Sequence, residues 1–164
     1  MYYDESRAFE FHADALPHLI DMIEDADDED VKLFIASAYR SFNDQAGLKA
    51  SYQVTYGSGA NAFSADQGYS EHQLGTTVDL TTTGINGGLV GAFDQTPAFR
   101  WLSENAYKYG FVLSYPKGNA YYVYEPWHWR FVGVKLAKYL HREEKNFYDL
   151  DQRDIDCYLA DIFD

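Results

Sequence analysis

One stretch of the chain decides how the fold can be predicted: GYSEHQLGTTVDLTT, residues Gly68–Thr82. Its last part, Thr77–Thr82, is rich in β-branched residues and alternates in polarity, which predicts a strand with Asp79 and threonines on one face and aliphatic side chains on the other. His72 and Asp79 are both side chains that zinc accepts as ligands. Two candidate ligands arise often by chance, and a lone histidine is more often a hydrogen-bonded structural group. A metal site therefore requires a third ligand from elsewhere in the chain.

The third candidate lies in YEPWHWRF, residues 124–131. If Trp127–Phe131 is a strand, His128 and Arg130 share one face while the three aromatic side chains pack on the other. Two histidines and an aspartate would make a tetrahedral zinc site with its fourth position open for water, the pattern of catalytic zinc. Glu125 could then lie near the metal without binding it and exchange protons with water and a leaving amine. The alternative, a core histidine beside a surface glutamate, stays open on spacing alone.

Length and composition indicate one globular domain. The chain has 164 residues, 46% of them hydrophobic, with no internal repeat and no low-complexity linker. Fifteen tyrosines and eleven phenylalanines suggest aromatic packing and a groove lined with rings. The single cysteine, Cys157, excludes an intramolecular disulfide.

Charge excludes several classes of partner. The formal net charge of −13 disfavours binding to nucleic acid or to anionic membranes, which both require clustered cations. No apolar run approaches the roughly 20 residues of a membrane span. The acidic, aromatic start of the chain is unlike a signal peptide, so we expect either another export route or an excised domain.

The remaining pattern predicts a mixture of helices and short strands, which favours an α+β fold with a small antiparallel sheet. On the first helix we expect Leu16, Leu19, Ile20 and Ile23 to share the buried face. In the third, Thr96 is expected to cap the start, Pro97 to occupy the first position and Gly110 to end the helix. The expected helices cover residues 17–24, 43–51, 97–109, 134–144 and a last one from about 151; the expected strands cover 31–39, 77–82, 111–116, 121–125 and 127–133.

Four motifs in order resemble one family. They are Ser37-Ala38-Tyr39-Arg40-Ser41-Phe42-x-x-Gln45; Ser70-x-His72-x-x-Gly75-x-Thr77-x-Asp79; Glu104 to Phe111 with Ser114-Tyr115-Pro116; and Glu125-Pro126-Trp127-His128. Together they resemble the VanY-type D-alanyl-D-alanine carboxypeptidases and the related LdcB-like L,D-carboxypeptidases, zinc metallopeptidases of peptidoglycan stem peptides. The similarity covers roughly residues 31–138 and implies a fold of the hedgehog/D-Ala-D-Ala metallopeptidase type, with the sheet carrying the zinc site and helices flanking it.

The resemblance implies a role for each motif residue. It implies one Zn²⁺ per chain, held by His72, Asp79 and His128, with Glu125 as catalytic base. It further implies that Arg40 and Gln45 contact the substrate and that Ser70 lies near the substrate's terminal carboxylate. Arginine suits this task because its planar fork can hold a carboxylate or a developing oxyanion by two hydrogen bonds. A surface ion pair is the alternative for Arg40.

Some positions depart from the family pattern. Ala38, Phe42 and Thr77 stand where Gly, Tyr and Ala are usual, and the segment before Tyr121 lacks a Thr-Gly-Tyr found in some members. None of these is an expected ligand or the expected base, so they affect the expected substrate preference. The whole chain, residues 1–164, is expected to be one zinc carboxypeptidase domain with a core over about 31–138 and an acidic helical extension over about 145–164.

The sequence therefore predicts a zinc-dependent D-alanyl-D-alanine carboxypeptidase that uses zinc-activated water and a glutamate base on peptidoglycan stem peptides. An L,D-carboxypeptidase acting on tetrapeptide stems would share the ligands and the base, so it remains an alternative. A zinc-containing peptidoglycan-binding module without turnover is the alternative from another class, and the presence of Glu125 argues against it. The family resemblance implies a bacterial cell envelope or extracellular location.

Overall fold

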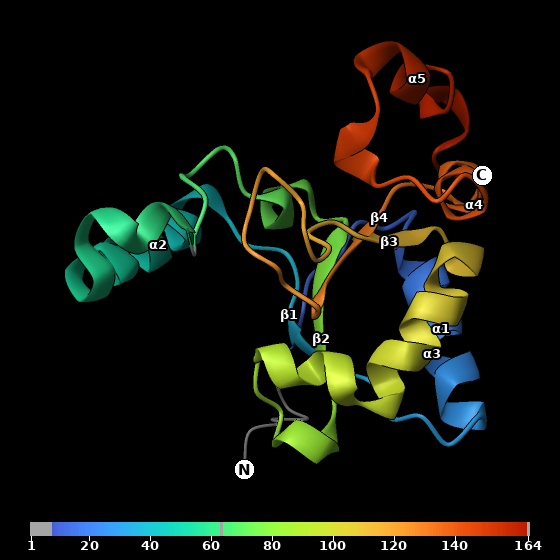
Figure 1. The fold of residues 1–164 in the computed structure, drawn as a ribbon, viewed down its shortest axis with the longest axis horizontal. Coiled ribbons are helices and arrows are strands. Elements are labelled where there is room, and N and C mark those ends of the chain that lie inside the picture. The colour runs from blue at the N-terminus through green and yellow to red at the C-terminus, as the bar shows by residue number, and fades with distance from the viewer. Residues whose placement is uncertain (1–7, 63, 164) are drawn as a thin grey trace.

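The computed structural model describes residues 8–62 and 64–163 and has the expected α+β architecture (Figure 1). Four antiparallel strands form one sheet in the order β1-β2-β4-β3. The strands are β1 Phe34–Ser37, β2 Thr77–Thr81, β3 Phe111–Leu113 and β4 His128–Phe131. The small antiparallel sheet predicted from the sequence is thus confirmed.

The pairing of β2 with β4 is the part of the sheet that matters for function. These two central strands run antiparallel, with Asp79 directly opposite His128. On the other edge of β2, Ser37 of β1 lies opposite Asp79, next to a bulge that follows Ile35. The register therefore brings two of the three predicted ligands face to face, although they are far apart in sequence.

Helices cover the face of the sheet that points away from these ligands. Helix α1 Leu16–Asp28 and helix α3 Pro97–Asn105 lie side by side on that face (Figure 1). The Thr96 side chain accepts a hydrogen bond from the Phe99 amide at 3.2 Å, so the predicted cap of α3 is confirmed. The core between sheet and helices includes Leu19, Met22, Val78, Leu80, Leu102, Phe111, Trp129 and Phe131.

The buried face of α1 was predicted only in part. Leu19 is buried as expected, but Leu16 and Ile20 are 39% and 44% exposed. The helix continues to Asp28, four residues past the predicted end, and Met22 and Ala26 continue its buried side. Buried residues that recur every three to four positions along the whole helix define its buried face, and Leu16 and Ile20 lie outside that face.

The predicted strand over residues 121–125 is wrong, and the segment is an irregular loop. The Asn119 side-chain oxygen accepts hydrogen bonds from the Tyr121 and Tyr122 amides, at 3.0 and 2.7 Å. A side chain that occupies these amides competes with ladder pairing and turns the chain. The predicted strand over 31–39 also shortens to the four half-buried residues of β1, an edge strand.

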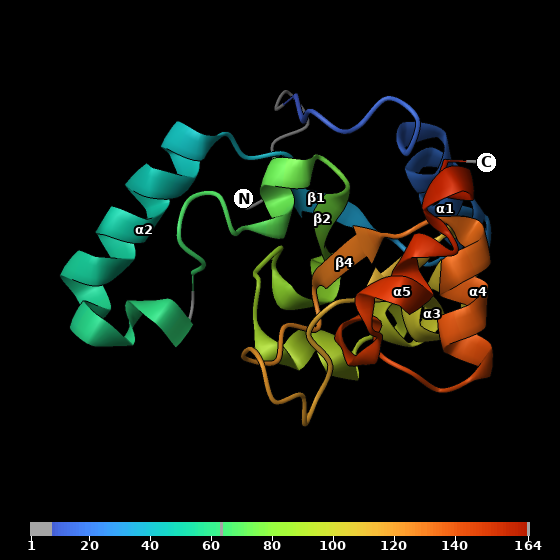
Figure 2. The same ribbon diagram turned by 90° about the horizontal axis from the view of Figure 1, so that it is seen from above.

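Helix α2 Phe42–Tyr56 projects from the body of the molecule, together with the 3-10 turn Gly57–Ala62 that follows it (Figure 2). The helix is longer than the predicted 43–51. Only Gln45 and Lys49 are buried among its residues. We call α2 and this turn the arm; Arg40 lies just before its start.

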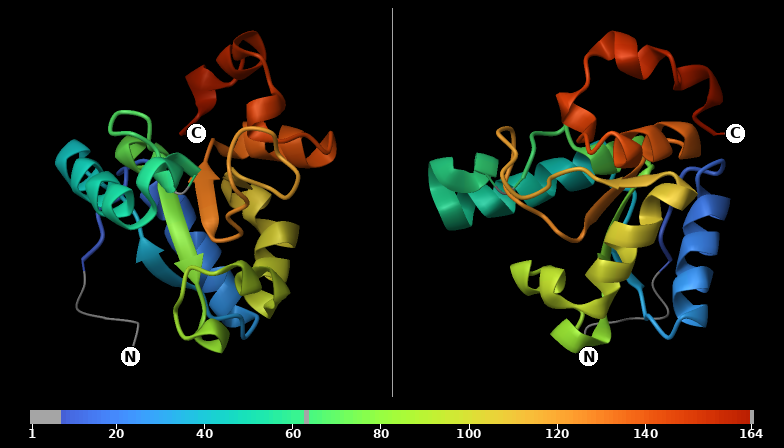
Figure 3. Two further views of the ribbon diagram at one scale, coloured as in Figure 1. Left: turned by 60° about the vertical axis from the view of Figure 1, so that its left-hand side comes forward. Right: turned by 45° about the vertical axis from the view of Figure 1, so that its right-hand side comes forward.

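The C-terminal part forms a second, smaller cluster around helix α4 Val134–Arg142 (Figure 3). The last helix, expected from about residue 151, begins as predicted but is only the short helix α5 Gln152–Asp156. A 3-10 turn, Phe147–Asp149, precedes it and a further 3-10 turn, Leu159–Asp161, follows it. Ile155 and Tyr158 pack against the cluster, so this part of the predicted apolar stripe serves packing. Across residues 8–62 and 64–163, the helices are all too short or too polar to cross a membrane.

Candidate metal centre

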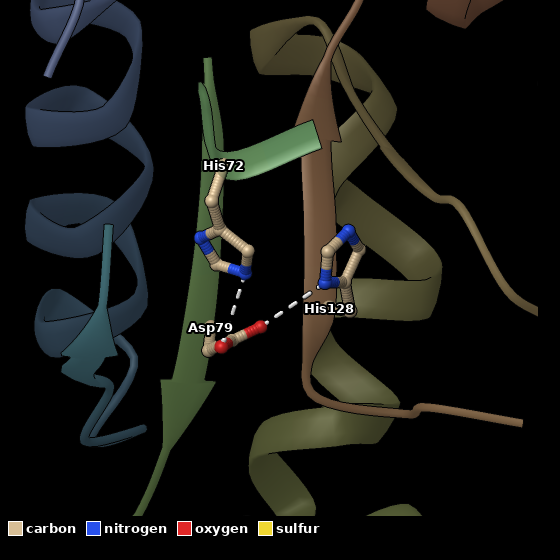
Figure 4. A group of neighbouring side chains, drawn as sticks. All are labelled: His72, Asp79 and His128. Carbon is tan, nitrogen blue, oxygen red and sulfur yellow. Dashed lines mark ion pairs between the residues drawn. The ribbon is translucent and has the colours of Figure 1, made fainter. Parts of the chain in front are cut away.

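The structure brings the three predicted ligands together on the open face of the sheet (Figure 4). His72 comes from the 3-10 turn Glu71–Leu74, Asp79 from β2 and His128 from the first position of β4. One ligand atom from each lies within 4.8 Å of the others. His72 Nε2 is 3.3 Å from Asp79 Oδ2, and His128 Nδ1 is 3.2 Å from Asp79 Oδ1.

The second nitrogen of each imidazole is already bonded to the protein. His72 Nδ1 lies 2.7 Å from the Ala38 carbonyl oxygen, and His128 Nε2 lies 2.8 Å from Glu71 Oε2. Each of these nitrogens donates its proton to an oxygen acceptor, which leaves the lone pair of the other nitrogen directed at Asp79. Metal-binding histidines are held in this way, with the remote N–H fixed by a carbonyl or carboxylate.

This donor set fits a divalent metal ion. Two imidazole lone pairs and the oxygens of a buried carboxylate face one another, and the side chains are only 5–6% exposed. Such groups repel in the absence of a shared cation or proton. Two nitrogens and one oxygen are the donors zinc accepts in a site with one position open.

Glu125 lies beside the ligands without pairing to Asp79. Its Oε2 is 3.6 Å from His128 Nδ1, and its backbone carbonyl accepts a hydrogen bond from the His128 amide at 3.1 Å. Burial raises the pKa of Glu125 to about 7; the nearby Asp79 adds to this effect, while His128 and Arg40 oppose it. A carboxyl group with a pKa near neutrality can both accept and return a proton at physiological pH. A bound cation would move this pKa downward.

A cavity of about 170 Å³ opens in front of these groups. The remaining predicted site residues Arg40, Gln45 and Ser70 all line it, together with Glu125 and the ligands. Arg40 donates from Nη1 to Gln45 Oε1 at 2.7 Å and from Nη2 to Ser37 Oγ at 3.3 Å. These bonds hold the guanidinium at the cavity wall, between Gln45 of α2 and Ser37 of β1.

Gln45 is almost fully enclosed. It is 1% exposed, and its amide nitrogen donates to the Ser64 hydroxyl at 3.0 Å and to the Ala65 carbonyl at 2.7 Å. Its contribution in this geometry is to fix Arg40 and to tie the arm to the segment that follows it.

Aromatic rings form much of the remaining wall, which agrees with the groove suggested by the tyrosine content. Tyr52, Tyr115, Tyr122 and Trp127 line the cavity. The Tyr115 ring lies 4.7 Å from the His128 ring. Trp127 was expected on the face away from the ligands, but it precedes β4 and lines the cavity while also packing against the core.

The sequence argument missed Glu71, the residue next to His72. A glutamate next to a candidate ligand is weak evidence for a role at the site, because in an extended chain neighbouring side chains point to opposite faces. Residues 71 and 72 lie instead in a 3-10 turn, where neighbouring side chains diverge less, and Glu71 contacts the imidazole of His128.

Residues 8–134 match the model of the family described as VanY, D-alanyl-D-alanine carboxypeptidase. The chain belongs to this family. The chain is also similar to the putative carboxypeptidase YodJ of Bacillus subtilis, with 38% identity over an alignment of 136 residues that covers 77% of this chain and 46% of YodJ. The chain thus spans about half the length of this curated relative.

Two solved structures resemble nearly the whole fold. LdcB, an LD-carboxypeptidase, has a TM-score of 0.81 at 30% identity, covering 96% of this chain and 73% of LdcB. A vancomycin-resistance D,D-pentapeptidase VanY in complex with Zn(II) has a TM-score of 0.77 at 27% identity, covering 90% of this chain and 86% of that one. The α+β metallopeptidase fold expected from the sequence is confirmed by these likenesses.

Proposed function

We propose that this chain is a zinc-dependent D-alanyl-D-alanine carboxypeptidase that removes the C-terminal D-alanine from peptidoglycan stem peptides. The observation that carries the proposal is the convergence of His72, Asp79 and His128 on one point, with the outer nitrogen of each imidazole already fixed. One Zn²⁺ per chain would be held there. The similarity to a VanY structure that contains Zn(II) supports this choice of metal.

Each residue of the cavity has a chemical task in this reaction. A bound zinc ion would polarise the scissile carbonyl and lower the pKa of water at the open position. Glu125 accepts the proton of the attacking water and returns it to the leaving amine. Arg40 donates its forked hydrogen bonds to the oxygen on which negative charge develops or to the terminal carboxylate.

Recognition of the chain end rests on charge. Arg40 faces the cavity of a protein whose net charge is −13, so it can attract a carboxylate into a surrounding that otherwise repels anions. Ser70 lines the same cavity and is assigned to the terminal carboxylate of the substrate. Gln45 is assigned to the substrate side through its bond to Arg40. A cavity that binds a terminal carboxylate favours removal of the last residue over internal cleavage.

An L,D-carboxypeptidase acting on tetrapeptide stems is the second candidate. The structural likeness to LdcB, which covers 96% of this chain, favours it. Both reactions would use the same ligands and base. The choice between the two substrates would therefore depend on the shape of the cavity wall that the arm and the tyrosines form. A peptidoglycan-binding module without turnover fits less well, because Glu125 lies beside the ligands and is largely buried.

We further propose that the chain acts as one domain of the bacterial cell envelope or the extracellular space. The family acts on the cell wall, which supports the location. The cavity draws residues from the arm, the sheet and the loop before β4, which supports a single domain.

Mass spectrometry of two synthetic stems tests the function. Zinc-loaded protein is incubated with a pentapeptide ending in D-Ala-D-Ala and with a tetrapeptide ending in one D-Ala. Loss of one alanine from the pentapeptide alone supports D,D-carboxypeptidase activity, and loss from the tetrapeptide alone supports L,D-carboxypeptidase activity instead. If zinc is bound and neither stem gives a product, the proposed hydrolase activity is refuted.

A further inference from the structure

Glu71 is the most heavily hydrogen-bonded carboxylate near the metal centre. It is 4% exposed. Its Oε2 accepts the His128 Nε2 proton at 2.8 Å, and its Oε1 accepts hydrogen bonds from Arg130 Nη1 at 2.8 Å and from the Tyr148 hydroxyl at 2.5 Å. Three donors, two from strand β4 and one from the segment after α4, therefore fix both oxygens of one side chain.

The contact with Glu71 fixes the imidazole of His128. A carboxylate that accepts the proton of His128 Nε2 sets the tautomer and the ring orientation, and it makes Nδ1 a stronger ligand. The direction of the His128 lone pair thus depends on where Glu71 is held.

Both of the other two donors are braced by one short segment after α4. The ring of Phe147, which is 7% exposed, lies 4.5 Å from the guanidinium carbon of Arg130. Its neighbour Tyr148 donates directly to Glu71 and stacks on Tyr115, with ring centroids 6.1 Å apart and ring planes 6° apart. The segment itself is fixed by hydrogen bonds between Asn146 and Asp149.

This segment lies outside the part of the chain that carries the family match. The match ends at residue 134, whereas Tyr148 belongs to the extension beyond α4, which Figure 3 shows curving back over the end of the sheet. Among the described residues, those lining the cavity include Tyr115 but not Tyr148. Tyr148 therefore contacts Glu71 on the side away from the cavity.

We propose that Tyr148 is a positioning residue of the metal centre: its hydrogen bond to Glu71 orients His128, so that the C-terminal extension completes the zinc site. The proposal rests on the proposed function for the identity of the metal. It assigns Tyr148 no contact with substrate. Its effect must therefore appear in metal affinity and turnover and not in substrate binding.

The test compares Tyr148→Phe with Tyr158→Phe, the same loss of a hydroxyl in the same extension, where Tyr158 packs on Tyr139 and the α4 cluster. Zinc affinity is measured by competition with a chromophoric chelator, which requires no substrate. Removing partners behind a metal ligand typically weakens affinity about 10- to 100-fold. We expect Tyr148→Phe to lose about 10-fold, with a lower kcat, an unchanged KM and an unchanged melting temperature of the metal-free protein; Tyr158→Phe should change none of these.

A second pair of variants shows whether Tyr148 acts through Glu71. Glu71→Gln keeps the shape of the side chain but removes its charge, and it should weaken zinc binding by at least as much as Tyr148→Phe. Adding Tyr148→Phe to Glu71→Gln should then have little further effect, because the two act in one chain of contacts.

The outcomes separate this proposal from the proposed function. Equal zinc affinity of Tyr148→Phe and the unmodified chain would overturn the positioning role, even if hydrolysis is confirmed. Additive effects of the two substitutions would overturn it too. Failure of the unmodified chain to bind zinc would overturn both proposals, whereas tight zinc binding without hydrolysis would refute only the function.

Discussion

Trp129 offers a direct test of how the sheet holds a metal ligand. It follows His128 on β4, points to the opposite face and is 3% exposed. Its indole lies 6.3 Å from the ring of Phe99 on α3, and its Nε1 donates to the Pro126 carbonyl at 3.0 Å. The hydrogen bond ties down the turn between Glu125 and His128. Trp129→Ala should therefore loosen both the core and the turn between Glu125 and His128.

The size of the effect follows from burial. Truncating a buried tryptophan to alanine typically costs about 3–5 kcal/mol, through lost apolar contacts and the cavity left behind. At about 2–4 °C per kcal/mol for a chain of this size, the melting temperature should fall by roughly 6–20 °C. Zinc affinity should fall with it, because a ligand on a strand is held in place only while its opposite face is packed.

Calorimetry with and without zinc measures the change in melting temperature, and competition with a chelator measures the change in zinc affinity. Trp129→Phe is the matched control, since it keeps a ring in the core and loses mainly the hydrogen bond to Pro126, worth about 0.5–1.5 kcal/mol. The melting temperature and zinc affinity of Trp129→Phe should lie between those of Trp129→Ala and of the unmodified chain. If Trp129→Ala melts and binds zinc like the unmodified chain, and only binding to intact cell wall weakens, the packed-wall argument is wrong and the ring serves glycan contact.

Three further predictions concern the cavity. Glu125→Ala should retain one zinc per chain by metal analysis and lose hydrolysis by at least about 100-fold, as expected for loss of a general base; full activity would refute the base. Arg40→Lys keeps the charge but loses the planar fork that bonds Gln45 and Ser37, so turnover should fall while the melting temperature changes little, and a much lower melting temperature with normal turnover would make Arg40 structural. His128→Ala leaves two ligands and should cost both zinc affinity and activity, so zinc binding at the unmodified stoichiometry and affinity would remove it from the ligand set.

The helices and strands nearest the metal centre were predictable because their signals are local. Strand β2 follows from alternation within six residues, and the start of α3 follows from its Thr-Pro pair. The predicted end at Gly110 is wrong for α3 itself, which stops at Asn105; Gly110 ends the 3-10 turn Ala106–Tyr109 that follows. The loop over residues 121–125 defeated the same reasoning: its tyrosines and valine favour a strand, but the Asn119 side chain occupies two of the amides that pairing would need. A single side chain outside the segment changed its structure, and propensity does not report such contacts.

The distinction between local signals and long-range contacts applies to the site as well. The ligand candidates could be named from the sequence because zinc restricts which side chains can bind and because their spacing repeats that of a family. Glu71 and Tyr148 could not, since the hydrogen bond between them joins residues 77 positions apart and depends on the path of the chain after α4. Long-range polar contacts of this kind leave no period or spacing in the sequence.

The proposed metal ligands and the proposed substrate wall lie on different structural elements. The ligands lie on the two central strands and the turn that precedes them, and partners from the sheet, the helical core and the C-terminal segment brace these elements. Arg40 lies instead at the base of the arm, which has only two buried residues along α2. Substitutions along the arm can therefore change the cavity wall while the metal centre stays intact. Of the departures from the family pattern beside Arg40, Phe42 begins the arm, whereas Ala38 supplies the carbonyl that fixes His72 and belongs to the metal centre.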